Sequence, residues 1–341
     1  MRKRISIVYT GGTIGMQKRS DGYAPSPGYL DKLMAAMPEL KHPHMPKIHI
    51  GAFDPLIDSA DMEPDDWLKI ADTIAVNYNA YDGFIVLHGT DTMSYTAAAL
   101  SFMLEGLAKP VILTGGQIPL CEIRNDSREN LISAILIATD FDIPEVCLFF
   151  GSKLIRGNRA VKINSGGFDA FDSPNYPPLG IAGVRIDIQS DLLLSAPSKK
   201  TTLTVAALHK TPVAALRLFP GISAEVVANI IAPPVKGVVL ETFGMGNVPS
   251  HNTKLLEVLK DAIDRGVVIV NCTQCLKGRV EMQAYATGHV LGRIGVISGH
   301  DMTAEAALAK MFYLFGRKYS IENIKKLMQK NLKGELVSVP K

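Results

Sequence analysis

Short runs of β-branched and aliphatic residues recur along the chain and alternate with longer segments of helical character. They are rich in Val, Ile and Leu, as strands buried on both faces of a sheet usually are. The alternation of strand and helix predicts a mostly parallel sheet with helices on both faces. The runs are ISIVY, FIVL, PVILT and VCLFF in the first half, then VAALRL, VVLETF and VVIVN in the second.

Five segments have the composition and periodicity of helices. One begins with Pro64 and two aspartates, residues that favour the first turn of a helix. Another is rich in Ala and Leu and stops before Lys109-Pro110. The predicted helices span 64–78, 92–107, 125–141, 303–316 and 320–331.

The alternation breaks at QSDLLLSAPSKKTTL (189–203), where Ser, Thr, Lys and Pro replace the apolar runs, and it resumes from Pro212. A chain of 341 residues is long enough for two domains. We therefore expect a larger N-terminal catalytic α/β domain, a linker and a smaller C-terminal α/β domain. Their predicted limits are 1–188, 189–211 and 212–341.

The charges of the chain nearly balance, with 36 Lys and Arg against 33 Asp and Glu. This balance predicts no nucleic acid or membrane partner and favours a small-molecule ligand. The apolar part of MRKRISIVY is shorter than the roughly 7–15 residues of a signal-peptide core. Four cysteines are too few for a disulfide framework in so long a chain. We therefore expect a cytoplasmic protein.

Two threonine-rich loops follow predicted strands. YTGGTIG (9–15) follows the first strand, and HGTDT (88–92) follows a later one. In open parallel sheets, ligands bind beyond the carboxyl ends of the strands, so both loops should lie at one ligand-binding edge. The spacing Gly-Gly-x-x-Gly does not match a dinucleotide-binding turn. A tight turn between strand and helix therefore stays open as a structural role for the first loop.

The second loop has two open interpretations. Thr90 or Asp91 could cap the helix that begins near residue 92, a contribution of about 1 kcal/mol. A cap needs one oxygen, whereas Thr90, Asp91 and Thr92 offer three, so the loop could also carry catalytic groups. His88 is expected to be buried and structural. Lys162 could replace histidine as a base, although a single lysine is more often a surface residue.

Three other features of the sequence could take part in a functional site. The segment 16–29 is rich in Gly and Pro and contains Tyr23, as a lid over a site or an exposed loop would. Cys272-Thr-Gln-Cys275 is one C-x-x-C pair and cannot close a structural zinc site alone. The histidines at 42, 44 and 49 have no further ligand at suitable spacing. We expect neither a metal nor a cofactor.

Taken together, TGGTIG, HGTDT and Lys162 resemble the signatures of the L-asparaginase family, most closely its bacterial type I, cytoplasmic branch. The resemblance runs along essentially the whole chain. It implies a two-domain α/β amidohydrolase that converts L-asparagine and water to L-aspartate and ammonia without a cofactor. Further matching segments are DSADM (58–62), KPVILTGGQIP (109–119), RGNRAVK (156–162), GMGN (244–247) and NCTQC (271–275).

The resemblance assigns catalytic roles to matching positions. Thr13 corresponds to the nucleophile that attacks the side-chain amide, and Tyr23 to its hydroxyl partner. Thr90, Asp91 and Lys162 correspond to a second triad, in which the lysine tunes a threonine that handles a proton or water. The assignment of the acyl group to Thr13 comes from the family.

The resemblance also implies how the substrate is held. Asp58, Ser59 and Ala60 lie in the substrate-binding segment, where Ser59 corresponds to a ligand of the α-carboxylate. Asp91, beside Thr90, would also bind the α-ammonium group. Asn247 matches an asparagine that reaches the neighbouring protomer's site, so the active unit is expected to be a homodimer or a homotetramer.

Two departures from the family pattern leave alternatives open. Ala60 stands where type I relatives often carry serine, so the resemblance leaves open whether the site prefers asparagine or glutamine. Some cytoplasmic members bind a second asparagine near the positions of Thr273 and Cys275, but an arginine of that effector site is Glu241 here. Besides weak glutaminase activity, the alternatives are a glutaminase, an ammonia donor for tRNA-linked amidation, and a non-catalytic amino-acid sensor.

Overall fold

The computed structural model describes residues 2–20, 22–198, 200–208, 210–282 and 286–337, and it divides the chain into two compact units. Unit 1 comprises Met1–Val205 and unit 2 comprises Ala206–Lys341. Unit 1 therefore includes the first part of the segment proposed as a linker. No helix among the described residues is both long and apolar enough to cross a membrane.

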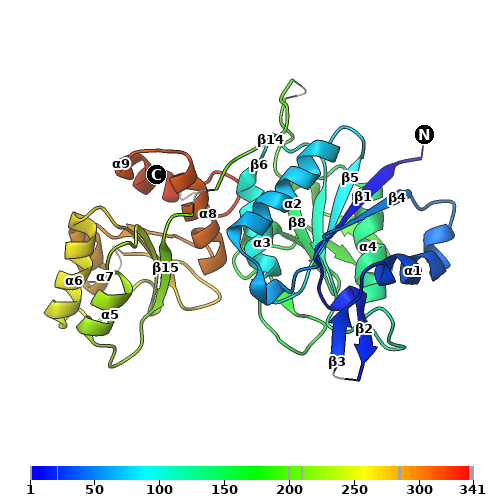
Figure 1. Cartoon of the computed structure of the whole chain (residues 1–341). Helices are drawn as coiled ribbons and strands as arrows, with labels where there is room; N and C mark the ends of the chain where they lie inside the picture. Colours follow the sequence, from blue (N-terminus) through cyan, green and yellow to red (C-terminus); the bar gives the residue numbers. More distant parts are fainter. Residues whose placement is uncertain (1, 21, 199, 209, 283–285, 338–341) are drawn as a thin grey trace. The chain divides into compact units, whose positions relative to one another are not determined.

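Unit 1 is built on an eight-stranded sheet in the spatial order β13-β12-β9-β8-β7-β5-β1-β4 (Figure 1). The strands from β8 to β4 are parallel, and the pairings beyond β8 are antiparallel. The four runs predicted as strands in this half are confirmed as β1, β5, β7 and β8. The strands are β1 (Arg4–Tyr9), β4 (Lys47–Ala52), β5 (Gly83–Leu87), β7 (Val111–Thr114), β8 (Val146–Phe150), β9 (Lys153–Arg156), β12 (Gly180–Ala182) and β13 (Ile186–Ile188).

Helices cover both faces of this sheet. The three helices predicted in this half are confirmed, although the second one ends four residues before the predicted limit of 107. The chain there enters a short strand pair, β6 (Leu104–Glu105) with β14 (Thr204–Val205). The helices are α1 (Tyr29–Ala36), α2 (Pro64–Asn77), α3 (Met93–Met103) and α4 (Ser127–Asp140), with short 3-10 turns η1 (Thr13–Gly15), η2 (Glu39–Lys41), η3 (Ser59–Asp61), η4 (Gly157–Arg159) and η5 (Ser190–Leu192).

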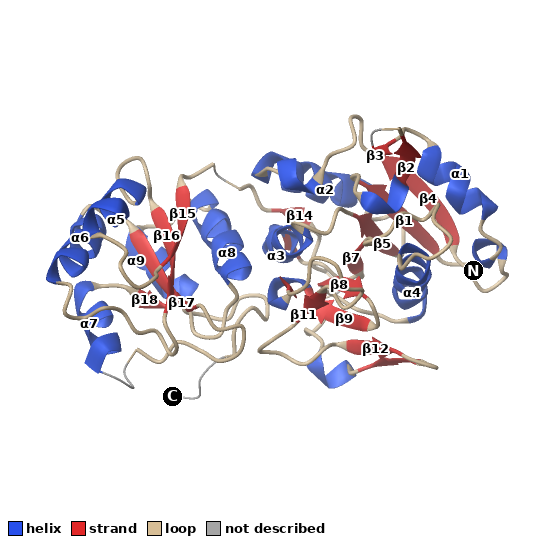
Figure 2. Ribbon diagram, turned by 90° about the horizontal axis from the view of Figure 1, so that it is seen from below, coloured by secondary structure: helices blue, strands red, loops and turns tan. Residues whose placement is uncertain are grey.

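The helix α4 lies across the sheet from α2 and α3 (Figure 2). Its Leu131 shares one core with Leu30 of α1 and with Ile7 of β1. The connection from β5 to β7 through α3 and the connection from β7 to β8 through α4 run in the same direction across the sheet. Because α3 and α4 lie on opposite faces, the two crossovers have opposite hands, whereas nearly all such crossovers are right-handed. The change of face brings the segment 115–126 to the β1 loop, where the Leu120 amide donates to the Ile14 carbonyl at 3.1 Å.

The segment predicted as a lid or exposed loop forms a two-stranded antiparallel hairpin, β2 (Met16–Arg19) and β3 (Gly22–Pro25). A second small pair, β10 (Val161–Lys162) and β11 (Phe171–Asp172), lies beyond β9. Both pairs are separate two-stranded sheets, and both carry candidate site residues.

Unit 2 has a four-stranded parallel sheet in the order β15-β16-β17-β18, which confirms the predicted smaller α/β unit. Helices α5, α6 and α7 contribute to its apolar core. The two helices predicted near the end of the chain are confirmed as α8 and α9. The elements are β15 (Val213–Arg217), α5 (Ala224–Ile230), β16 (Gly237–Thr242), α6 (Thr253–Asp264), β17 (Val268–Thr273), α7 (Ala286–Ile294), β18 (Ile297–Ser298), α8 (Ala304–Gly316) and α9 (Ile321–Met328).

A buried ion pair stabilises unit 1. The Arg156 guanidinium donates to Glu145 at 2.6 Å, and both side chains are almost fully buried. Glu145 also accepts the Leu194 amide at 2.8 Å. Replacing Glu145 by alanine leaves a buried cation without its partner, so we expect a loss of about 3–5 kcal/mol in the free energy of unfolding. Urea unfolding measures the change.

The control for this variant is Lys260→Ala. It removes an exposed ion pair with Asp264 on α6, worth at most about 0.5 kcal/mol. Equal and small effects of both substitutions would show that the buried pair does not stabilise the fold.

Candidate active site

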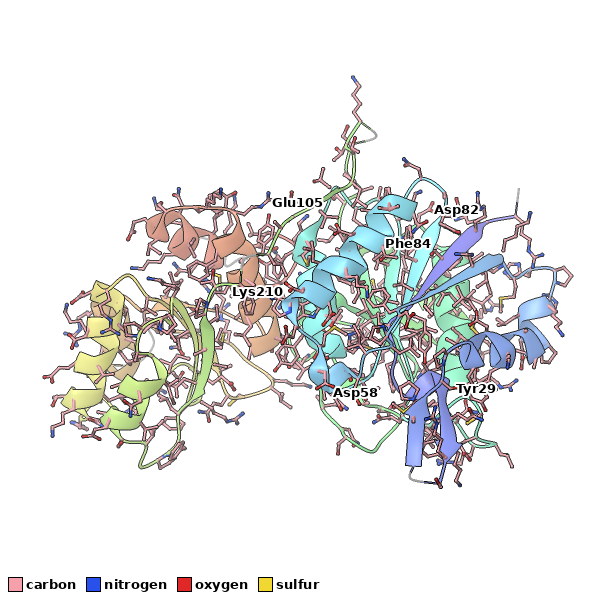
Figure 3. All side chains as sticks on the ribbon, in the orientation of Figure 1. Tyr29, Asp58, Asp82, Phe84, Glu105 and Lys210 are labelled. Carbon is pink, nitrogen blue, oxygen red and sulfur yellow. The ribbon has the colours of Figure 1, made fainter. Side chains whose placement is uncertain are left out.

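The topology of the parallel strands locates a crevice. In the spatial order β4-β1-β5-β7-β8, the chain leaves β1 for one neighbour and later returns to the other, so the order of connection reverses between β1 and β5. Ligands of open α/β sheets bind at the carboxyl end of such a switch point. Asp58 lies at this end of unit 1, opposite Asp82, which precedes β5 at the amino end (Figure 3). The loops that follow β1 and β5 border the crevice.

Glycines let three loops pack backbone against backbone at this crevice. A Cβ at Gly12, where φ is +91°, would lie 2.4 Å from the Gly89 nitrogen. A Cβ at Gly89 would lie 2.3 Å from the Ser59 hydroxyl oxygen. Side chains at these positions would push the loops apart. The two glycines therefore bring the loops of Thr13, Ser59 and Thr90 into direct contact.

Thr90, Asp91 and Lys162 form one hydrogen-bonded cluster. The Lys162 ammonium donates to Thr90 Oγ1 at 2.9 Å and to Asp91 Oδ1 at 2.6 Å. Thr90 is buried and the Lys162 side chain is 18% exposed, whereas that of Asp91 is 65% exposed. The cluster therefore has a buried hydroxyl, a lysine between hydroxyl and carboxylate, and a carboxylate that a ligand can reach.

Lys162 reaches this cluster through local packing far along the chain. The turn η4 packs against α3, where a Cβ at Gly157 would lie 2.9 Å from the Ala97 carbonyl oxygen. The pairing of β10 with β11 then sets Lys162 opposite Phe171. Because α3 begins just after Asp91, this packing places the lysine beside the β5 loop.

The predicted cap at Thr90 or Asp91 is wrong. The N-cap of α3 is Thr92, and its side chain caps no amide of the helix. Within the described residues, Thr92 Oγ1 instead donates to the Ser59 carbonyl at 2.7 Å. The Thr92 hydroxyl therefore contacts the η3 loop. The Thr90 and Asp91 side chains contact Lys162 and do not cap the helix.

His88 is buried, as predicted. Burial lowers its pKa to about 4. Its Nδ1 faces the Gly89 carbonyl at 2.7 Å and therefore carries the proton. Its Nε2 then accepts from the Thr96 hydroxyl at 2.9 Å, and that hydroxyl accepts from the Trp67 indole at 3.0 Å. His88 holds the strand end and is not a base.

Thr13 and Tyr23 line the same cavity, which has a volume of about 540 Å³. The Tyr23 hydroxyl donates to Glu122 at 2.6 Å, and this hydrogen bond raises the pKa of Tyr23. Tyr23 therefore stays protonated at neutral pH, on the wall of the cavity that Thr13 shares. Its hydrogen-bond partner, Glu122, was not predicted.

Gln117 is the second residue that the sequence analysis missed. It lines the cavity with Thr13, and its side-chain Oε1 accepts from the Thr90 hydroxyl at 3.3 Å. Its Nε2 donates to the Gly167 carbonyl at 3.1 Å. Gln117 lies in the segment 109–119, which resembles the family, but an uncharged amide after a strand does not by itself indicate a functional residue.

Three of the six residues predicted to bind substrate lie at η3, where Asp58 is the N-cap and Ser59 and Ala60 are in the turn. Ser59 is 3% exposed, and its hydroxyl lies where the β5 loop passes. Asp58 is exposed and accepts the Ala60 amide at 3.0 Å, which shapes the turn. The Ala60 side chain is exposed. Ser59 is the one of the three whose side chain touches the loop of Thr90.

The remaining candidates lie in unit 2. Asn247 closes a turn, with its carbonyl accepting from the Phe243 amide at 3.0 Å. Glu241 on β16 pairs with Arg217 at 3.4 Å. The Thr273 hydroxyl accepts the Cys275 amide at 3.0 Å.

The Cys272 thiol is buried near the carboxyl groups of Glu241 and Glu305. Burial raises the pKa of the Cys272 thiol to about 12, and the carboxylates of Glu241 and Glu305 act in the same direction. Burial likewise raises the pKa of Glu305. Burial therefore favours the uncharged forms of Cys272 and Glu305, and the carboxylate of Glu241 is paired with the Arg217 guanidinium.

The described residues contain no group of three or more His, Cys, Asp or Glu side chains that could hold a metal ion. Over the same part of the chain, all four cysteines are free thiols; Cys272 is buried and Cys275 is exposed. His44 contacts Asp140 at 3.1 Å on the surface.

Family comparisons cover both units. The family described as "Asparaginase, N-terminal" matches residues 4–194, and "Glutaminase/Asparaginase C-terminal domain" matches residues 212–328. Among curated proteins, L-asparaginase 1 of Escherichia coli K12 is 50% identical over 335 residues, which cover 98% of each chain.

Solved structures give the same result. The structure of L-asparaginase I from Vibrio cholerae superposes with a TM-score of 0.92 at 49% identity, covering 99% of this chain and 100% of that one. A structure described as "Probable Cytoplasmic L-asparaginase from Campylobacter jejuni" superposes with a TM-score of 0.81 at 26% identity, covering 97% and 100%. The glycine-packed loops, the threonines and the full-length similarity agree, and the chain belongs to the asparaginase family.

Proposed function

We propose that this chain hydrolyses the side-chain amide of L-asparagine to L-aspartate and ammonia. The observation that carries the proposal is the Thr90–Asp91–Lys162 cluster at the switch-point crevice, beside the loop of Thr13. Hydrolysis of an unactivated amide needs a nucleophile, a carrier for its proton and donors for the developing oxyanion. Each of these has a candidate in this crevice.

In the first half of the proposed reaction, the Thr13 hydroxyl oxygen attacks the amide carbon. The hydroxyl proton passes to the leaving nitrogen, and the tetrahedral intermediate collapses to ammonia and an aspartyl ester of Thr13. Tyr23, a protonated hydroxyl on the same cavity wall, is the proposed hydrogen-bond partner of this threonine. Backbone N–H groups of the glycine-flanked loops are the proposed donors to the oxyanion.

In the second half, water cleaves the ester, and a second proton carrier is needed because the water must lose a proton as it attacks. Thr90 and Lys162 are the proposed carriers. Asp91 is accessible enough to bind the substrate ammonium group while it accepts from Lys162. Ser59, at the β5 loop, is the proposed ligand of the α-carboxylate. No step requires a cofactor.

L-Glutamine is the competing substrate, and one of the matched families carries both names. The two amides differ by one methylene, which a pocket can discriminate by roughly 10–200-fold. We expect kcat/KM for ammonia release to favour L-asparagine by a ratio in this range. Ammonia release is measured with both substrates over a concentration series. A kcat/KM for L-glutamine equal to or above that for L-asparagine would contradict the proposed substrate.

We further propose that the active unit is at least a homodimer and that the enzyme is cytoplasmic. The resemblance to the type I branch supports both. For the dimer, it assigns Asn247 to the neighbouring protomer's site. For the location, one structural neighbour is described as cytoplasmic. Glu241, which stands where the effector site of some relatives has an arginine, reverses the charge there and weighs against cooperative control by a second asparagine near Thr273 and Cys275.

A further inference from the structure

The backbone of Gln117 is fixed by hydrogen bonds that do not involve its side chain. Its amide nitrogen donates to both carboxylate oxygens of Asp126, at 3.0 and 2.9 Å. Asp126 is buried at the start of α4 and also accepts the Ile118 amide at 3.0 Å and the Asn130 side-chain amide at 3.3 Å. The position of the glutamine Cα is therefore fixed relative to α4.

The orientation of the glutamine side-chain amide follows from its partners. Gly167 offers a carbonyl oxygen, which can only accept, so the amide Nε2 must face it. The Oε1 atom is then turned toward Thr90. Arg124 stacks on Phe168 at 4.8 Å and packs the same 164–168 loop against the segment of Gln117. The loop contact thus keeps an acceptor, and not a donor, directed at the threonine.

The Thr90 hydroxyl has one proton and two different neighbours. It accepts from the Lys162 ammonium at 2.9 Å, so its own proton cannot point there. Its proton is directed to Gln117 Oε1 at 3.3 Å. We infer that Gln117 is a positioning residue for the reaction, because it sets the direction of the Thr90 hydroxyl that the second half-reaction uses. This role rests on the proposed asparagine hydrolysis.

The test separates this role from a purely structural one. Gln117→Met keeps the length of the side chain but removes both polar contacts. Gln117→Glu keeps an acceptor oxygen for Thr90 and loses the donor to Gly167. If the contact with Thr90 matters, the glutamate variant recovers most of what the methionine variant loses. If only the loop contact matters, the two variants are equally impaired.

Steady-state ammonia release from L-asparagine and thermal unfolding are measured for both variants and for Gln329→Met, an exposed glutamine on unit 2. We expect Gln117→Met to lower kcat about 10- to 100-fold with KM within about threefold, since displaced reacting groups cost that much. Gln117→Glu should restore most of kcat, and Gln329→Met should match the unmodified chain. If the methionine variant does not fold, Gln117→Asn, which withdraws the acceptor by one methylene, should show the same loss of kcat.

Three results would overturn the role. They are an unchanged kcat in Gln117→Met, equal losses of kcat in the methionine and glutamate variants, and a loss confined to KM. Each of these, with an active unmodified chain, leaves the proposed function intact. If the unmodified chain releases no ammonia from L-asparagine, the proposed function fails and the role of Gln117 fails with it.

Discussion

We expect the replacement of Thr13, the proposed nucleophile, by alanine to abolish ammonia release from L-asparagine and to leave the fold intact. Removal of a covalent nucleophile lowers kcat by on the order of 10⁴-fold or more, because the acyl intermediate can no longer form on it. Thr13 is half-buried on a cavity wall, and alanine is smaller, so the β1 loop keeps its packing. Ammonia release over a substrate series, with circular dichroism for the fold, measures the effect.

Thr13→Ser is the matched variant, because it keeps the hydroxyl and removes one methyl group. It should retain a measurable fraction of kcat. If Thr13→Ala turned over L-asparagine at a rate close to that of the unmodified chain, Thr13 would not be the nucleophile.

The second large effect is expected for Lys162→Met. This substitution removes the ammonium that contacts Thr90 and Asp91 but keeps a chain of similar length. Loss of a proton carrier lowers kcat by about 10²–10⁴-fold. Stability should change by no more than about 1 kcal/mol, because Asp91 is largely exposed and solvent screens the pair. Ammonia release and thermal unfolding test both expectations.

Lys153→Met is the control for the loss of a lysine ion pair. Lys153 lies on β9 and pairs with Asp172 at 2.9 Å, and both side chains of this pair are partly buried. Its kcat should stay within about twofold of the unmodified chain. Equal kcat losses in the two variants would mean that the effect of Lys162 comes from general stability and not from the cluster.

The sequence predicted the parts of the site that depend on strand ends. Buried apolar runs identify β1 and β5, and parallel strands deliver Thr13 and Thr90 to one edge. Lys162 was a possible base from the sequence alone, and the family resemblance joined it to Thr90 and Asp91. Its position beside Asp91 depends on the packing of η4 against α3. Such packing has no local signature in the sequence.

Other features depend on contacts between distant segments, which local patterns do not encode. The predicted cap failed because the helix begins after Thr92, and because the Thr90 and Asp91 side chains contact Lys162, which lies far along the chain. Glu122 and Gln117 were missed because they reach the site only through the crossover of α4 to the other face of the sheet.

The most direct test of the proposed mechanism is to identify the residue that carries the acyl group during turnover. The unmodified chain is mixed with saturating L-asparagine, quenched in acid during turnover, digested and analysed by mass spectrometry. We expect an aspartyl ester on the peptide that contains Thr13, and no such ester in Thr13→Ala treated in the same way. An ester on Thr90 would contradict the proposed mechanism, because Thr90 and not Thr13 would then be the nucleophile.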